Sequence, residues 1–108
     1  MTEESNLLGL LRAYYRGDRL ARAALVDWLE ESGDARADAV RQEGLDWDAV
    51  ARQLWPLDPY IPWGRWRWYV DCARVGSPVL PEVAQAVQEA RRRWLQKLFP
   101  EVDLSAAG

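Results

Sequence analysis

The chain has 108 residues, of which 49% are apolar and 29% charged, a composition typical of one globular domain with a modest core. It contains no histidine and only one cysteine, Cys72, which excludes histidine-dependent catalytic triads, metal sites built from histidine or several cysteines, and internal disulfides. No apolar run is long enough to cross a bilayer, and the polar N-terminal segment lacks the features of a signal peptide. We therefore expect a cytoplasmic protein that is not an enzyme, that binds no cofactor or metal and that does not contact membranes.

The charged residues are unevenly distributed along the chain. Residues 27–58 hold nine acidic residues against three arginines, a net charge of −6, whereas residues 59–99 have a net charge of +4. Thirteen of the fourteen basic residues are arginine, and seven residues of the chain are tryptophan. Because opposite charges on the two segments would attract each other, this pattern predicts head-to-tail self-association.

The apolar pattern predicts two helices at the start of the chain. The first covers residues 4–16 and ends at Gly17. Asp18 is a suitable N-cap for the second helix, and Gly33 is a suitable left-handed residue after its last turn. One face of this second helix collects most of its apolar side chains: Leu20, Ala24, Leu25, Trp28 and Leu29.

Two further short helices are predicted before residue 57. The third covers residues 35–43, is capped by Asp34 and ends at Gly44. The fourth begins after Asp46 and stops at Pro56, because proline cannot continue a helix. Its buried side is predicted to carry Trp47, Val50, Ala51 and Leu54. The tight connections predict that the four helices pack as antiparallel neighbours.

The second half of the sequence combines loop, strand and helix patterns. Prolines and a glycine predict a loop over residues 57–64. Alternation of apolar and charged residues over 65–75 predicts a strand, and residues 101–104 could add a second short strand. A helix is the alternative for 65–75, and it would bury Trp66, Tyr69, Val70 and Ala73. Residues 81–98 predict a long amphipathic helix with the stripe Val83, Val87, Ala90, Trp94 and Leu98.

These elements predict a mainly α fold. About four short helices form a small bundle, and a short strand and a long C-terminal amphipathic helix pack on the same core. Four tryptophans are predicted to be core residues: Trp28, Trp55, Trp66 and Trp94. Trp63 and Trp68 are predicted to be partly exposed.

One segment, RLARAALVDWLEESGDARADAVRQE (19–43), has a distinctive order of charged and apolar residues. It resembles the repeat-companion domain of planctomycete and myxobacterial proteins. The positions that match the pattern of that family are Arg19, Leu20, Asp27, Trp28, Leu29, Glu30, Glu31, Gly33, Asp34, Arg36, Arg41 and Gln42. The chain departs from the pattern at Val26, where alanine is usual, and at Ala35, where proline is usual. The resemblance implies a helical domain over residues 1–56 with no enzymatic activity to transfer.

Residues 57–108 are similar to the segment that follows this domain in some leucine-rich-repeat proteins. The order of WYVDCARV (68–75), the helix at 81–98 and FPEVDLS (99–105) carries the similarity. Trp68 and Phe99 depart from it, where glycine and histidine are usual. The similarity implies an N-terminal cap, which shields the apolar end of a repeat array.

Four acidic residues follow a helical spacing around the family motif: Asp27, Glu30, Glu31 and Asp34. This spacing places the carboxylates along one side of the second helix. The favoured interpretation is a solvated face, with Asp34 as a cap and Asp27 paired with a neighbouring arginine. Docking to a basic partner and binding of a hard cation are the alternatives.

A second candidate site combines arginine and tryptophan, the residues that most often anchor protein interfaces. The predicted partner-binding residues are Trp63, Arg65, Arg67, Trp68, Arg91, Arg92 and Arg93. We expect a non-catalytic protein-interaction module or small adaptor subunit that binds another protein. The alternative is an accessory subunit that binds single-stranded nucleic acid through Trp63–Tyr69 and Arg91–Arg93, because arginine neutralises phosphate and aromatic rings stack on bases. Cys72 is predicted to be a buried structural residue.

Overall fold

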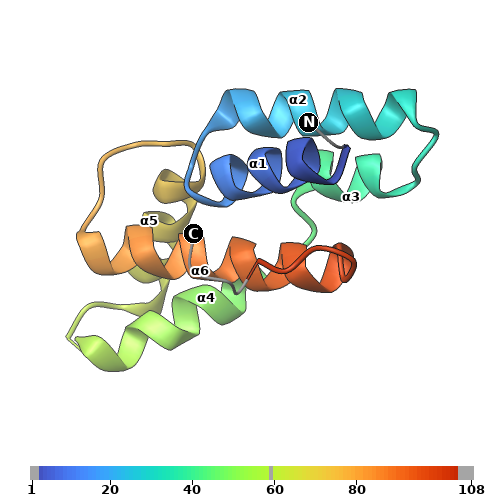
Figure 1. The fold of residues 1–108 in the computed structure, drawn as a ribbon. Coiled ribbons are helices and arrows are strands. Elements are labelled where there is room, and N and C mark those ends of the chain that lie inside the picture. Colours follow the sequence, from blue (N-terminus) through green and yellow to red (C-terminus); the bar gives the residue numbers. More distant parts are fainter. Residues whose placement is uncertain (1–2, 59, 105–108) are drawn as a thin grey trace. The chain divides into compact units, whose positions relative to one another are not determined.

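The computed structural model describes residues 3–58 and 60–104, and all regular secondary structure in this part of the chain is helical (Figure 1). Six α-helices and one short 3-10 helix follow one another: α1 (Glu3–Tyr15), α2 (Arg19–Glu31), α3 (Arg36–Gln42), α4 (Trp47–Leu54), η1 (Trp55–Leu57), α5 (Trp63–Arg74) and α6 (Pro81–Leu98). The predicted mainly α class and the long C-terminal helix are confirmed, whereas the described residues contain neither of the predicted strands.

The chain divides into two compact units. The terminal unit consists of Met1–Gly44 and Arg92–Gly108, and the central unit consists of Leu45–Arg91. Each unit has its own cluster of buried side chains. The first part of helix α6 contributes to the cluster of the central unit, and its last part contributes to the cluster of the terminal unit. The division at residue 56 and the core shared by all elements remain predictions.

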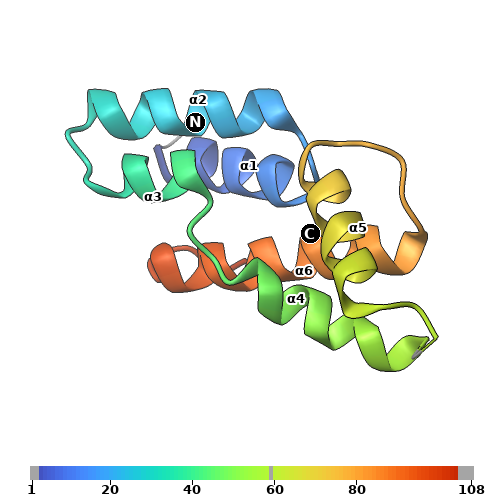
Figure 2. The same ribbon diagram turned by 180° about the vertical axis from the view of Figure 1, so that it is seen from behind.

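In the terminal unit, α1, α2 and α3 run back and forth as antiparallel neighbours (Figures 1 and 2). The N-cap and the C-terminal glycine of α2 are confirmed. The side chain of Asp18 accepts hydrogen bonds from the backbone amides of Leu20 and Ala21, and Gly33 has a φ of 69°. The face that α2 buries differs from the predicted one, since Leu20 is 82% exposed. The buried side chains of α2 are Ala21, Leu25, Val26 and Leu29.

A buried glutamate lies where α3 ends. Glu43 adopts a left-handed conformation with a φ of 48°, and only 3% of the residue is exposed. Its carboxylate accepts a hydrogen bond from the Tyr14 hydroxyl at 2.5 Å and lies 3.8 Å from the guanidinium of Arg22. Since a buried carboxylate without partners would be costly, these contacts explain how α1 and α2 accommodate it.

The segment after α6 is held by side chains rather than by a strand partner. The Gln96 side-chain amide donates to the carbonyl oxygens of Phe99 (3.3 Å) and Val102 (2.6 Å), and its oxygen accepts from the Leu104 amide (2.7 Å). Val102 and Leu104 are buried in the terminal core. The predicted strand at 101–104 is therefore wrong, because Gln96 satisfies the backbone groups that a second strand would otherwise pair with.

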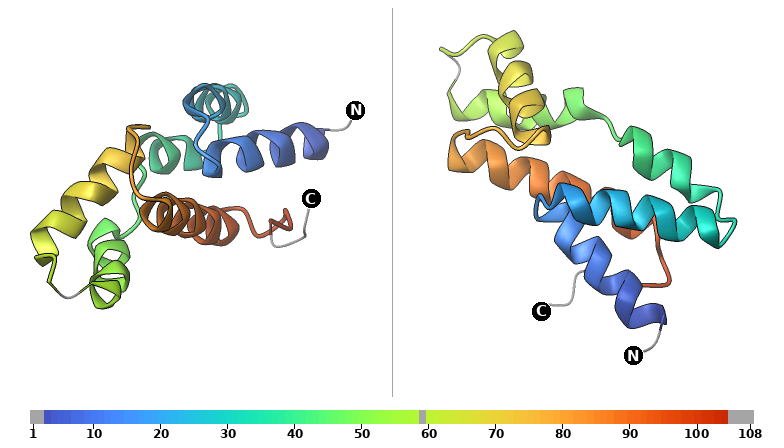
Figure 3. Two further views of the ribbon diagram at one scale, coloured as in Figure 1. Left: turned by 90° about the vertical axis from the view of Figure 1, so that its left-hand side faces the viewer. Right: turned by 90° about the horizontal axis from the view of Figure 1, so that it is seen from above.

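In the central unit, α4 and α5 lie side by side (Figure 3). Asp46 caps α4 as predicted by accepting a hydrogen bond from the Ala49 amide. The four predicted core residues of α4 are all buried: Trp47, Val50, Ala51 and Leu54. Two arginines contact the Trp47 ring, with Arg74 Cζ 4.4 Å and Arg91 Cζ 5.8 Å from its centroid.

Residues 65–74 are helical and Val75 is the C-cap of α5, so the strand predicted at 65–75 is wrong and its helical alternative is right. Helix α5 buries Trp66 and Val70, which are four residues apart, and packs Tyr69 and Ala73 partly against the same cluster. No other strand is present in the described residues to complete a β-ladder, whereas a helix satisfies its backbone hydrogen bonds internally.

Two further predictions about the core need correction. Of the four predicted core tryptophans, Trp66 is buried and Trp28 and Trp94 are partly buried, but Trp55 is 46% exposed, because it lies in η1 just past the buried face of α4. The buried residues of α6 recur every four positions: Val83, Val87, Arg91 and Leu95. They differ from the predicted stripe in the second half of the helix.

Among the described helices, none has both the length and the apolar character needed to span a bilayer.

Candidate protein-binding surface

The central unit carries an apolar pocket beside the exposed side of α5. We call it the Trp68 pocket. It has a volume of about 450 Å³ and is lined by Trp68, Tyr69, Cys72, Pro78, Val79, Leu80 and Pro81. Helix α5 supplies the first three residues, the segment before α6 supplies the next three, and Pro81 is the first residue of α6. Trp68 is 56% exposed and Leu80 is 48% exposed, so large apolar surfaces face the solvent at this pocket.

The helical register of α5 explains this arrangement. Because Trp66 and Val70 face the core, Arg65, Trp68 and Cys72 fall on another side of the helix, three and four residues apart. Trp68 packs beside Tyr69, with ring centroids 5.5 Å apart, and Arg65 Cζ lies 5.9 Å from the Trp68 ring. Arg65 thus lies next to the apolar pocket as a cationic neighbour.

Two of the predicted partner-binding arginines have structural contacts inside the central unit. Arg67 bonds with Asp48 at 2.7 Å and with Asp71. Burial opposes the charge of Arg67, but the hydrogen bonds with these two carboxylates outweigh it and raise the pKa of Arg67. Arg91 is 6% exposed and donates to the carbonyl oxygen of Arg74 at the end of α5.

The remaining predicted residues do not form one surface within either unit. Trp63 is 37% exposed at the start of α5, in the same unit as Trp68. Arg92 and Arg93 belong to the terminal unit, and both have contacts within the protein. The structure therefore brings Arg65 and Trp68 together within the central unit, whereas Arg92 and Arg93 are assigned to the terminal unit.

The residues of the acidic set differ in their contacts. Glu30 pairs with Arg41, and Asp34 pairs with Arg36 at 2.6 Å, whereas Asp27 and Glu31 line a groove between α1 and α2. The predicted pairing of Asp27 with an arginine is thus wrong, because Arg41 pairs with Glu30 instead. Within the described residues, no group of three or more aspartate, glutamate or cysteine side chains is placed to hold a metal ion.

Three of the other residues that match the repeat-companion pattern, Arg36, Leu29 and Gly33, have contacts or conformations that support the fold. Arg36 Nη1 donates to the Leu98 carbonyl oxygen at 3.0 Å and to Glu101 at 2.6 Å, and Arg36 Cζ lies 4.1 Å from the Phe99 ring centroid. Leu29 is fully buried, and Gly33 adopts the left-handed conformation after α2. These contacts join the motif to the end of α6 within the terminal unit.

Sequence reasoning did not identify Cys72 and residues 78–81 as lining a pocket. Cys72 is partly buried rather than fully buried, and it faces the pocket. The only sequence signal for this pocket was a run of apolar residues outside any periodic pattern: Pro78, Val79, Leu80 and Pro81.

Comparison of the chain with protein-family models, with curated proteins and with solved structures finds no match.

Proposed function

We propose that the chain is a non-catalytic protein-interaction module and that the Trp68 pocket receives an apolar side chain of a partner protein. The observation that carries this proposal is the exposure of Trp68 and Leu80 around a pocket of about 450 Å³. Exposed apolar groups that surround a concave site are typical of binding surfaces. Arg65 at the edge would contribute a polar contact next to the tryptophan anchor, a common combination at interface hot spots.

The resemblance of residues 19–43 to the repeat-companion domain supports a non-catalytic role, since that family offers no enzymatic activity to transfer. The alternative, binding of single-stranded nucleic acid, has less support from the geometry. Trp66 is buried, and Arg67 and Arg91 are paired or buried inside the central unit. A nucleic-acid site would need several arginines directed at a phosphate backbone.

The test is a tagged pull-down from lysate of the native organism, performed with and without nuclease and read by quantitative mass spectrometry. Wild type is compared with Trp68→Ala and with Trp55→Ala, a matched control that removes an exposed tryptophan outside the pocket. We expect to capture a defined partner whose amount is unchanged by nuclease and by higher salt. The captured amount should fall at least about tenfold with Trp68→Ala and stay at the wild-type level with Trp55→Ala.

Cys72 provides a second readout, because it is the only cysteine of the chain and lines the pocket. The purified partner should slow alkylation of the Cys72 thiol in wild type and have no effect in Trp68→Ala. Equal loss of the partner in the two tryptophan variants would contradict the proposal. Capture that disappears with nuclease, with added salt and with the Arg92→Gln/Arg93→Gln variant would instead support nucleic-acid binding.

A further inference from the structure

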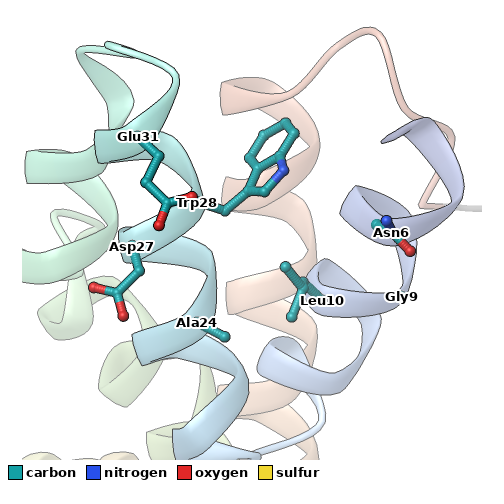
Figure 4. A pocket seen from close by; sticks show the side chains of 7 residues that line it. All are labelled: Asn6, Gly9, Leu10, Ala24, Asp27, Trp28 and Glu31. Atoms are coloured by element: carbon teal, nitrogen blue, oxygen red, sulfur yellow. The ribbon is translucent and has the colours of Figure 1, made fainter. Parts of the chain in front are cut away.

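A second concave surface lies in the terminal unit, between α1 and α2 (Figure 4). This α1–α2 groove has a volume of about 600 Å³. Asn6, Gly9 and Leu10 line it from α1, and Ala24, Asp27, Trp28 and Glu31 line it from α2. Within each helix the lining residues are three or four positions apart, so the groove follows both helix axes. A groove that follows two neighbouring helix axes suits a third helix laid against the pair.

The floor of the groove is apolar and only partly covered. Leu10 and Trp28 pack against the buried core of the terminal unit, yet both remain partly accessible. Figure 4 shows the Trp28 indole directed from α2 toward α1, with Leu10 beside it. A tryptophan and a leucine at the base of a groove are the kind of surface into which an apolar anchor residue packs.

Gly9 keeps the α1 side of the groove open. It lies in the middle of α1, where glycine costs roughly 0.5–1 kcal/mol relative to alanine. A Cβ atom at this position would meet no atom within 4 Å, so packing within the described protein does not require glycine there. On the opposite side the short side chain of Ala24 leaves similar room. Small residues on both sides allow the backbone of a bound helix to approach closely.

The charge at the edge of the groove has one sign. Asp27 and Glu31 are exposed, and their carboxylates form no hydrogen bond or ion pair with any described residue. In contrast, Glu30 and Asp34 of the same segment are paired with arginines. The groove residues include no basic side chain. Cationic groups would therefore be attracted to this edge, and nucleic acids or anionic lipids would be repelled.

Leu20 extends the apolar surface along α2. It is 82% exposed and lies one turn before Ala24, on the stripe that continues to Asp27 and Glu31. Nothing in the described terminal unit covers this leucine, although it is one of the residues that match the family motif.

We propose that the α1–α2 groove binds a basic amphipathic helix of a partner protein. Its apolar side chains would pack on Leu10 and Trp28 and on the space above Gly9, and its lysine or arginine residues would pair with Asp27 and Glu31. A guanidinium group over the Trp28 ring would add a cation–π contact. This binding site is separate from the Trp68 pocket in sequence and in unit, so the two proposals can fail independently.

The test uses a displayed library of 14-residue amphipathic helices in which apolar positions are varied and flanking positions are either lysine and arginine or glutamate. The full chain is the target, and peptides that also bind the Gly9→Leu variant are removed, because leucine at this position fills the groove. We expect the enriched peptides to be basic. Their affinity, measured by calorimetry, should fall at least about tenfold in Asp27→Asn/Glu31→Gln and in Leu20→Ser.

The matched control is Asp58→Asn/Glu82→Gln, which removes two negative charges from the central unit and should change affinity less than about twofold. Thermal unfolding followed by circular dichroism shows that each variant is folded. The Trp68→Ala variant should bind the peptides normally. Enrichment of acidic peptides, an absence of peptides that distinguish wild type from Gly9→Leu, or equal weakening by the two charge variants would each overturn the proposal.

Discussion

At the scale of single residues, Arg36 shows how one side chain can join several elements. Its guanidinium pairs with Asp34 and Glu101, donates to the Leu98 carbonyl oxygen and lies over the Phe99 ring. Charge-assisted hydrogen bonds of this kind are stronger than neutral ones, and the planar guanidinium suits several acceptors at once. The sequence predicts Asp34 as the N-cap of α3, whereas the N-cap is Ala35 and Asp34 Oδ1 accepts a hydrogen bond from the Arg36 amide. Sequence reasoning could not show that Arg36 links Asp34 to residues more than sixty positions later.

This contact makes stability depend on pH through Asp34. The hydrogen bonds from Arg36 hold the pKa of Asp34 below its usual value of 3.8. A carboxyl group with a lowered pKa in the folded state stabilises the protein above its unfolded pKa, and this contribution is lost as the pH falls through the folded pKa.

We therefore expect Asp34→Asn to reduce the free energy of unfolding by roughly 1–2 kcal/mol at about pH 7. The difference from wild type should narrow as the pH falls below about 4. Urea unfolding of both proteins across this range measures the effect, with Asp27→Asn as a control that removes an exposed, unpaired carboxylate. A difference that stays constant down to about pH 2 would contradict the assignment of Arg36 as the partner.

At the scale of secondary-structure elements, α5 is the main difference between prediction and structure. Apolar and charged residues alternate over 66–70 well enough for a strand. As a helix, however, the same segment places Trp66 and Val70 on one side. A single segment of this length fits either period. The element that packs against this segment decides between strand and helix. The described residues contain no second strand, whereas α4 presents a buried face to α5, formed by Trp47, Val50, Ala51 and Leu54.

The two neighbouring tryptophans test the helical register directly. In a strand, Trp66 and Trp68 would share a face and contribute similarly, whereas in α5 Trp66 is 3% exposed and Trp68 is 56% exposed. We expect Trp66→Ala to lower the free energy of unfolding by about 3–5 kcal/mol and Trp68→Ala by less than about 1 kcal/mol. Chemical denaturation followed by circular dichroism provides both values. Comparable losses would be inconsistent with the register of α5.

At the scale of the whole molecule, the fold redistributes the charges that are segregated along the sequence. The terminal unit contains eleven acidic and nine basic residues, and the central unit contains six acidic and five basic residues. The terminal unit therefore has a net charge of −2 and the central unit −1, whereas residues 27–58 and 59–99 of the sequence have net charges of −6 and +4. Part of the reason is that acidic and basic segments pair inside one unit, as Asp48 does with Arg67.

This balance bears on head-to-tail self-association, which the sequence pattern predicts. Because the two units have net charges of the same sign, we expect little attraction between copies at low salt. Multi-angle light scattering over a range of concentrations, at an ionic strength of about 0.01 M where the Debye length is about 30 Å, should give a constant monomer mass. A mass that rises with concentration and returns to the monomer value at higher salt would instead support association through the segregated charges.

The sequence by itself determined the positions of the helices before residue 57, their N-caps at Asp18 and Asp46, and the extent of α6, because these depend on local spacing and capping. Tertiary structure decided that residues 63–74 are helical, that Arg67 and Arg91 are structural, and that Trp68 and the α1–α2 groove are accessible. These outcomes depend on which segments distant in sequence pack together. Local periodicity does not contain that information, since the same side chain is core or surface according to what lies against it.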